Sequence, residues 1–295
     1  MPTKTRPLIT AEQIAQYNRD GFLVVENLFD QETVKQLIAR FDPLFSGEFE
    51  TGVYPDEWHW NPYLGKPGEA GQLTGGWKCD RTLAAAVTSV KVGQMAAELE
   101  GWSGARLLSD GIWQKPNGAK ETTLHQDSMY INYHTPSDVI VCWIALSHAV
   151  AGASTIEYAK GSHRWKLSEA VPEFHNQNRS YLAEMEQAAH LAGVDHPEVV
   201  QLDIASGSGV FHHGNTWHGS GQNQMPVIRR SMVLAYIPAE AQFKPYGAYV
   251  PGGYIAGKYR RHGDDTMDES FFPIVWHEDG YRTAFLEKYC GGNRG

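Results

Sequence analysis

The sequence has few cysteines, and their arrangement excludes two common kinds of small scaffold. Its 295 residues include three cysteines, Cys79, Cys142 and Cys290, and no two of them have Cys-x-x-Cys spacing. An odd number of separated cysteines argues against a disulfide framework and against a zinc ribbon. We therefore expect three reduced thiols in a cytoplasmic protein.

Long apolar runs and basic runs are also missing. No window approaches the roughly 20 apolar residues of a membrane span, and the first six residues lead into no apolar stretch of a secretory signal. The formal net charge is −9, from 34 acidic and 25 basic residues. These features predict no membrane and no nucleic-acid partner, and they disfavour bulky polyanionic substrates.

The periodicity of the sequence changes once, near residue 106, and no repeat or low-complexity tract is present. Before that point the pattern favours helices. Thr10 and Gln13 form a capping box, Asp30 can cap a second helix, and residues 81–100 are expected to be helical. The second helix is expected to bury one face at helical spacing, made by Val34, Leu37, Ile38 and Phe41.

From about residue 106 to 238 the sequence predicts strands separated by Gly, Pro and Asn clusters, as in an all-β barrel or sandwich. The expected strands are 106–113, 139–146, 154–158, 199–204, 208–213 and 229–237. Residues 178–195 are expected to form a helical or irregular insertion. We predict one domain over residues 1–295, with N-terminal helices in 8–100 and an extension, 239–295, wrapped on the barrel.

One short motif suggests a metal site. His125-Gln126-Asp127 places an imidazole and a carboxylate two residues apart, where a strand directs both to one face. Alone this motif is weak, but His218 follows downstream in the context His-Gly-Ser-Gly. Two histidines and one carboxylate can leave three open positions on an octahedral metal, the arrangement of non-haem Fe(II) oxygenases. We predict His125, Asp127 and His218 as the catalytic metal ligands, with His212 and His213 as rivals for His218.

Arg229 adds a site for a co-substrate. A 2-oxo acid can chelate iron through its carboxylate and keto oxygens, and its far carboxylate then needs a fixed cation. The planar arginine fork suits bidentate carboxylate binding, and the hydroxyl of Ser220 can add a hydrogen bond. Strand alternation directs the neighbouring Arg230 to the opposite face, where we expect a surface ion pair.

Taken in order, these motifs resemble the phytanoyl-CoA dioxygenase family of Fe(II)/2-oxoglutarate-dependent oxygenases. The resemblance covers roughly residues 8–238. It rests on Tyr17-Asn18-Arg19-Asp20-Gly21-Phe22, His125-Gln126-Asp127, Lys160-Gly161-Ser162-His163, and His218 with Arg229. It implies a mainly β fold with flanking helices around a double-stranded β-helix (jelly-roll, cupin-like) core. It also implies that Trp143 and Tyr130 lie at the co-substrate site.

The resemblance further implies a dioxygenase that uses Fe(II), 2-oxoglutarate and dioxygen and forms succinate and CO₂. Asp127 stands where related halogenases have a small residue, which favours hydroxylation; desaturation, epoxidation and ring closure stay open. We predict a small metabolite or natural-product-like substrate. The alternatives are an acyl-CoA hydroxylase of the same family, a non-catalytic metal-binding protein and a zinc hydrolase.

The substrate walls are the part of the site that the sequence determines least. Residues 46–77 are irregular and rich in aromatic side chains, among them Trp58 and Trp60. They form either a substrate wall or ordinary core packing. Trp113 and Lys115 are expected on a strand leading into His125, where they either face the substrate pocket or have a structural role.

Overall fold

The computed structural model describes residues 6–169, 180–245 and 257–291, apart from Pro62, Leu64 and Pro67. The helices of these ranges are α1 (Ala11–Asp20), α2 (Gln31–Ile38), α3 (Phe41–Phe45), α4 (Arg81–Val87), α5 (Val90–Glu100), α6 (Ala183–Leu191) and α8 (Phe285–Cys290), with short 3₁₀ turns η1 (Gly76–Lys78), η2 (Asp127–Met129) and η3 (Ser162–Arg164). The strands are β1 (Phe22–Val25), β2 (Glu57–Trp58), β3 (Gly71–Thr74), β4 (Gly104–Lys115), β5 (Thr122–His125), β6 (His134–Thr135), β7 (Ile140–Ala145), β8 (Ile156–Ala159), β9 (Val199–Gln201), β10 (Gly209–His213), β11 (His218–Ser220), β12 (Arg229–Pro238), β13 (Gln242–Phe243) and β14 (Ile274–His277).

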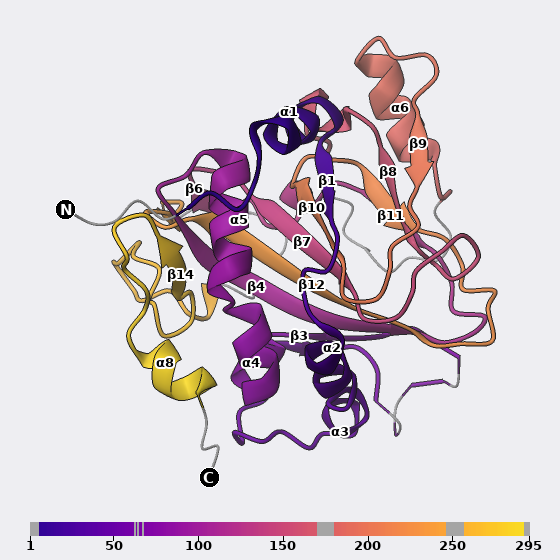
Figure 1. Ribbon diagram of the computed structural model, residues 1–295. Helices are drawn as coiled ribbons and strands as arrows, with labels where there is room; N and C mark the ends of the chain where they lie inside the picture. Colours follow the sequence, from indigo (N-terminus) through magenta and orange to yellow (C-terminus); the bar gives the residue numbers. More distant parts are fainter. Residues whose placement is uncertain are drawn as a thin grey trace.

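Two main sheets carry the fold (Figure 1). The large sheet has eight strands in the order β1-β10-β7-β12-β4-β3-β2, and β14 also pairs with β4. The small sheet has the order β5-β11-β8-β9, and β6 pairs with β13 in a third, two-stranded sheet. The two main sheets pack face to face through one apolar cluster, in which the rings of Phe22 and Tyr158 stack 4.5 Å apart. This is the jelly-roll core expected from the sequence.

The N-terminal helices begin where their capping residues predict. Thr10 forms the capping box with Gln13, α1 ends at Gly21 with a φ of 84°, and Asp30 accepts a hydrogen bond from the Thr33 amide. One expectation was wrong: α2 ends at Ile38, so Phe41 begins α3 instead of extending the face of α2. The helical character of residues 81–100 is confirmed, but as two helices, because α5 starts afresh with the Ser89 hydroxyl as its N-cap.

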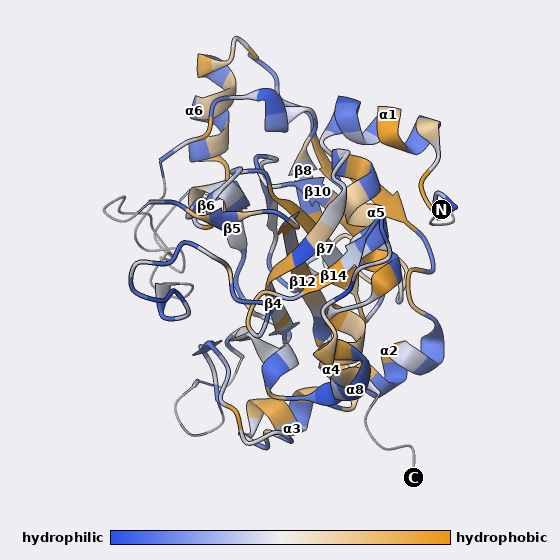
Figure 2. Cartoon of the chain, turned by 90° about the vertical axis from the view of Figure 1, so that its left-hand side faces the viewer, coloured by the Kyte–Doolittle hydropathy of each residue, from blue (hydrophilic) through white to orange (hydrophobic). Residues whose placement is uncertain are grey.

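The large sheet buries its outer face against helices. Every residue of β7 is buried, and alternate residues, Ile140, Cys142 and Ile144, pack into the cluster formed with α2, α3, α4 and α5. On the other face, Trp143 and Ala145 pack with residues of the small sheet, and Val141 packs with Phe243 and Met267. Hydrophobic residues therefore concentrate in the central strands and the helices beside them (Figure 2).

All six expected strands occur, with shifted ends, as β4, β7, β8, β9, β10 and β12, and α6 lies within the expected insertion. Two strands that carry the candidate histidines were not among the six: β11 was not expected, and β5 was expected only as a strand through the His125 motif. They have only three and four residues. In the C-terminal extension, β14 joins the large sheet and Tyr289 of α8 donates a hydrogen bond to the Trp77 carbonyl, 3.2 Å away. Within the described ranges, we find no helix both apolar and long enough to cross a bilayer.

Candidate metal and co-substrate site

The small sheet brings the three predicted ligands together. His125 ends β5 and His218 begins β11; they are direct partners in the ladder, with ring centroids 4.3 Å apart. Asp127 starts the turn η2, and its carboxylate and the two imidazoles offer donor atoms that all lie within 4.8 Å of one another. The expected strand through Asp127 was wrong, because β5 stops at His125. The turn still directs the carboxylate to the histidine pair.

Main-chain carbonyls orient both imidazoles. Nδ1 of His125 lies 2.8 Å from the Thr123 carbonyl, and Nδ1 of His218 lies 2.9 Å from the Thr216 carbonyl. A carbonyl oxygen only accepts, so each Nδ1 carries the proton and each Nε2 keeps its lone pair. The Nε2 atoms lie 3.5 Å and 3.6 Å from the carboxylate oxygens of Asp127. This is the orientation that metal-binding histidines require.

The charge states at the site also suit a metal. Burial lowers the pKa of His218 well below its usual value, although the Asp127 charge opposes this. Burial would raise the pKa of Asp127, but His218, His125 and His212 together hold it well below its usual value. Neutral imidazoles and an ionised carboxylate are the forms that bind metal. The Asp127 side chain keeps 22% exposure, against 7% for His125, so the group opens on the carboxylate side.

Two buried cations lie beside this group. Arg229 begins β12 directly opposite Lys115 in β4, and Lys115 donates a 2.8 Å hydrogen bond to the Ser220 hydroxyl. Among the described residues neither cation has an ion-pair partner, and Nε of Arg229 is buried without any hydrogen-bond partner. The guanidinium lies 5.5 Å from the Trp143 ring. Burial lowers the pKa of Arg229 to about 10. A dianion between these groups would relieve both charges.

The other predicted residues divide between the site and the outer core. Tyr130 lies edge-on to His125, with ring centroids 6.3 Å apart. Lys115 belongs with Ser220 and Arg229 instead of a substrate wall. Trp58 and Trp60 pack against the helix-side cluster, beyond the large sheet from the metal group. This packing favours ordinary core packing, which the sequence left open as the alternative to a substrate wall.

One wall of the site runs along the inner face of the large sheet. Ser109 and Trp113 of β4 and Val233 of β12 are only partly buried. Gly111 lies among them, and a Cβ built there would make ordinary van der Waals contact, with Trp113 Nε1 as the nearest atom at 3.5 Å. We call Ser109, Gly111, Trp113 and Val233 the inner wall. Arg230 points the other way and pairs with Asp42 at 3.8 Å, as predicted.

The sequence interpretation misplaced one functional candidate, His212. It was considered only as a rival ligand to His218, but its Nε2 lies 3.0 Å from Asp127 Oδ2. Strand alternation in β10 could have indicated its direction, since Phe211 beside it packs into the helix-side cluster. His213, on the other side, accepts a hydrogen bond from the Asn215 amide and lies 5.8 Å from the His163 ring.

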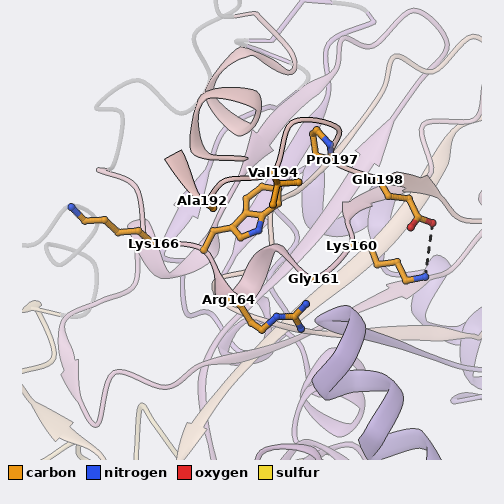
Figure 3. Close-up of a pocket in the computed structure, with 9 residues that line it drawn as sticks. Lys160, Gly161, Arg164, Lys166, Ala192, Val194, Pro197 and Glu198 are labelled. Carbon is orange, nitrogen blue, oxygen red and sulfur yellow. Dashed lines mark ion pairs between the residues drawn. The ribbon is translucent and has the colours of Figure 1, made fainter. Parts of the chain in front are cut away.

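A second hollow lies away from the metal group. Its volume is 460 Å³, and it opens between η3 and the end of α6, on the outer side of the small sheet (Figure 3). Lys160 and Glu198 form an ion pair on its rim, 3.9 Å apart. His125 and His218 face the opposite side of that sheet, so this hollow is not part of the metal site.

Comparison with known proteins agrees with this geometry. The family model described as phytanoyl-CoA dioxygenase (PhyH) matches residues 17–231. The chain belongs to the phytanoyl-CoA dioxygenase family. It is therefore an oxidoreductase of the Fe(II)/2-oxoglutarate-dependent dioxygenases, with dioxygen as the oxidant.

The relatives of this family member are distant. It is 22% identical over 253 residues to the peroxisomal phytanoyl-CoA dioxygenase of Rattus norvegicus, covering 80% of this chain and 70% of that one. It is 24% identical over 259 residues to the ectoine dioxygenase of Bordetella parapertussis, covering 80% and 78%. Among solved structures, the carbocyclase SnoK from nogalamycin biosynthesis superposes with a TM-score of 0.70 at 18% identity, covering 92% of this chain and 100% of that one. These structures share the fold.

Proposed function

We propose that His125, Asp127 and His218 hold Fe(II) and that Arg229, Lys115 and Ser220 bind the far carboxylate of 2-oxoglutarate. The observation that carries this assignment is the pair of buried cations beside the histidine–carboxylate group. Neither Lys115 nor Arg229 pairs with an acidic side chain among the described residues, and a buried unpaired charge is costly. A dicarboxylate bound there supplies the missing anion. Trp143 and Tyr130 flank the same space.

Iron with 2-oxoglutarate and dioxygen supplies an oxidant for a C–H bond, while 2-oxoglutarate becomes succinate and CO₂. The chain's own residues bind and orient. The carbonyls of Thr123 and Thr216 hold the two imidazoles, and Arg229 holds the co-substrate by a fork that fixes its direction. The apolar layer between the sheets excludes water from the reacting atoms.

We place the substrate against the inner wall, whose side chains Ser109, Trp113 and Val233 are only partly buried. The ladder register continues this wall from Gly111 to Thr74 of β3 and then to Glu57 of β2. A carboxylate on this row disfavours a polyphosphate such as the nucleotide part of coenzyme A. We therefore propose hydroxylation of a small metabolite in place of an acyl-CoA thioester. The ectoine dioxygenase and the nogalamycin enzymes are relatives or neighbours whose names point to small molecules.

We also propose that residues 1–295 act as one domain in the cytoplasm. The support is that β14 extends the large sheet through β4, and that Cys79, Cys142 and Cys290 are free cysteines.

Anaerobic titration with Fe(II) and 2-oxoglutarate tests the site. The wild type is expected to develop the absorption band of a chelated iron–2-oxoglutarate complex, and Asp127→Ala is expected to lose it. Asp203→Ala is the matched control, because Asp203 is 76% exposed and pairs only with His148 among the described groups. A band that survives Asp127→Ala would overturn the assignment.

A substrate panel under air tests the reaction. Succinate formation that a panel member stimulates, with a product heavier by one oxygen, supports hydroxylation. A hydrolysis product formed without dioxygen would instead support a zinc hydrolase. Metal binding with no 2-oxoglutarate turnover under any condition would support a non-catalytic protein.

A further inference from the structure

A third imidazole contacts the metal group without joining it. His212 of β10 is 1% exposed, and its Nε2 lies 3.0 Å from Oδ2 of Asp127. Its other nitrogen, Nδ1, lies 2.9 Å from the hydroxyl oxygen of Tyr158 in β8. His212 therefore bridges the two sheets, with both ring nitrogens engaged. Among the described residues, the group whose donor atoms converge consists of His125, Asp127 and His218 alone.

The hydrogen-bond chain selects one tautomer of His212. The Tyr158 hydroxyl is fully buried, and a buried hydroxyl proton needs an acceptor. If it donates to Nδ1, the ring proton sits on Nε2 and is donated to Oδ2 of Asp127. The other tautomer would aim the Nε2 lone pair at a carboxylate oxygen inside a low-dielectric core, which is repulsive. The order of donation is Tyr158 to His212 to Asp127.

This order leaves the two oxygens of Asp127 unequal. Each oxygen lies near one ligand nitrogen, Oδ1 at 3.5 Å from His125 Nε2 and Oδ2 at 3.6 Å from His218 Nε2. Only Oδ2 also accepts the hydrogen bond from His212. A carboxylate that bound the metal through both oxygens would take a position that the co-substrate and dioxygen need. A hydrogen bond that holds one oxygen prevents this, and it also reduces the rotation of the carboxylate.

We propose that His212, oriented by Tyr158, is a positioning residue that keeps Asp127 a one-oxygen metal ligand. This inference rests on the proposed metal site. It differs from a fourth-ligand role, because among the described residues the donor atoms that converge come from His125, Asp127 and His218, without His212. It also differs from a purely structural role, because it predicts an effect on metal binding that a chemically similar side chain restores.

Titration with Co(II), monitored by its visible absorption, tests the proposal without turnover. His212→Phe removes the donor but keeps a ring; it is expected to weaken Co(II) binding about 10- to 100-fold and to change the spectrum toward a different coordination number. His212→Gln places an amide donor near the Nε2 position and is expected to return binding to within about 5-fold of the wild type. Tyr158→Phe keeps the ring stacked on Phe22 and is expected to fall between these two.

Neighbouring residues and the metal-free protein provide the controls. His213→Phe alters the adjacent histidine, whose Nδ1 accepts a hydrogen bond from the Asn215 amide and not from the metal group, and is expected to bind Co(II) like the wild type. Unfolding midpoints of the metal-free variants separate a folding defect from a binding defect. If His212→Phe does not fold, His212→Gln and Tyr158→Phe still decide the question.

Three results would overturn the proposal. Wild-type Co(II) affinity and spectrum in His212→Phe would show that the hydrogen bond does not position the ligand. Failure of His212→Gln to restore binding, with one nitrogen ligand lost from the spectrum, would make His212 a ligand. If every His212 variant lost both Co(II) affinity and stability of the metal-free protein, to the same degree in each variant, His212 would be a structural residue. Absence of Co(II) binding by the wild type would refute the metal site itself.

Discussion

Replacing Lys115 by methionine is expected to stabilise the ligand-free protein and to weaken 2-oxoglutarate binding. Lys115 is 1% exposed on β4, and its ammonium has the Ser220 hydroxyl at 2.8 Å but no ion-pair partner among the described residues. Arg229 lies directly opposite it in the ladder. Burial, with the Arg229 charge adding to it, lowers the pKa of Lys115 well below its usual value. The fold therefore disfavours the charged form of Lys115 until an anion binds.

The expected magnitudes have opposite signs. Methionine has similar length and no charge, so the ligand-free protein is expected to gain about 1–3 kcal/mol, the desolvation penalty of an unsatisfied buried group. For a domain of this size that is roughly 2–4 °C in unfolding temperature per kcal/mol. The bound carboxylate loses one charge-assisted hydrogen bond of about 1.5–3 kcal/mol. The Kd of 2-oxoglutarate for the Lys115→Met protein should therefore rise roughly 10- to 150-fold.

Denaturant unfolding of the ligand-free protein and anaerobic calorimetric titration with Fe(II) and 2-oxoglutarate measure the two effects. The pH dependence gives a further check. The folded pKa of Lys115 lies below its unfolded value of about 10.4, so the unfolded chain binds more protons between the two values. Stability then rises with pH across that window, and Lys115→Met removes this rise. Lys35→Met, on the exposed side of α2, is the control.

A different pattern would refute this reasoning. If Lys115→Met lowers the stability of the ligand-free protein and leaves 2-oxoglutarate affinity unchanged, Lys115 is a structural residue. The two cations would then not form one binding site for a dicarboxylate.

Two other changes test the core and the inner wall. Burial raises the pKa of Asp110 to about 7, whereas the unfolded chain has a value of about 4. Protonation of Asp110 therefore stabilises the fold fully below about pH 4, and this stabilisation is lost as the pH rises through 7. Asp110→Asn keeps an acceptor for the Trp77 amide. It is expected to be more stable than the wild type at pH 8 by on the order of 3 kcal/mol. A stability difference between variant and wild type that is the same at pH 5 and pH 8 in denaturant unfolding would contradict this. Gly111→Leu adds a bulky side chain to the inner wall opposite Val233. It is expected to keep iron and 2-oxoglutarate binding and to lose the succinate formation that a substrate stimulates, and unchanged stimulation would place the substrate away from the inner wall.

Local rules accounted for much of the fold. Thr10 and Asp30 satisfy amides within a few residues, so their caps depend on little beyond the local sequence. The apolar run of β7 predicts a strand buried on both faces. The same rules failed where short strands form only by pairing. β5 and β11 have too few residues for a recognisable alternation of apolar and polar side chains. They form because the two strands pair with each other through backbone hydrogen bonds.

The sequence by itself determined the class of chemistry: His125, Asp127, His218 and Arg229 are the residue types that an iron and 2-oxoglutarate site needs, in an order typical of one family. The tertiary structure decided which other residues complete the site. Lys115 and Ser220 meet across two sheets, as do His212 and Asp127, through contacts that span 105 and 85 residues of chain. The sequence left the role of Trp58 open for the same reason, and the structure packs it against the helix-side cluster. Such contacts depend on strand register and sheet packing, which no local pattern contains.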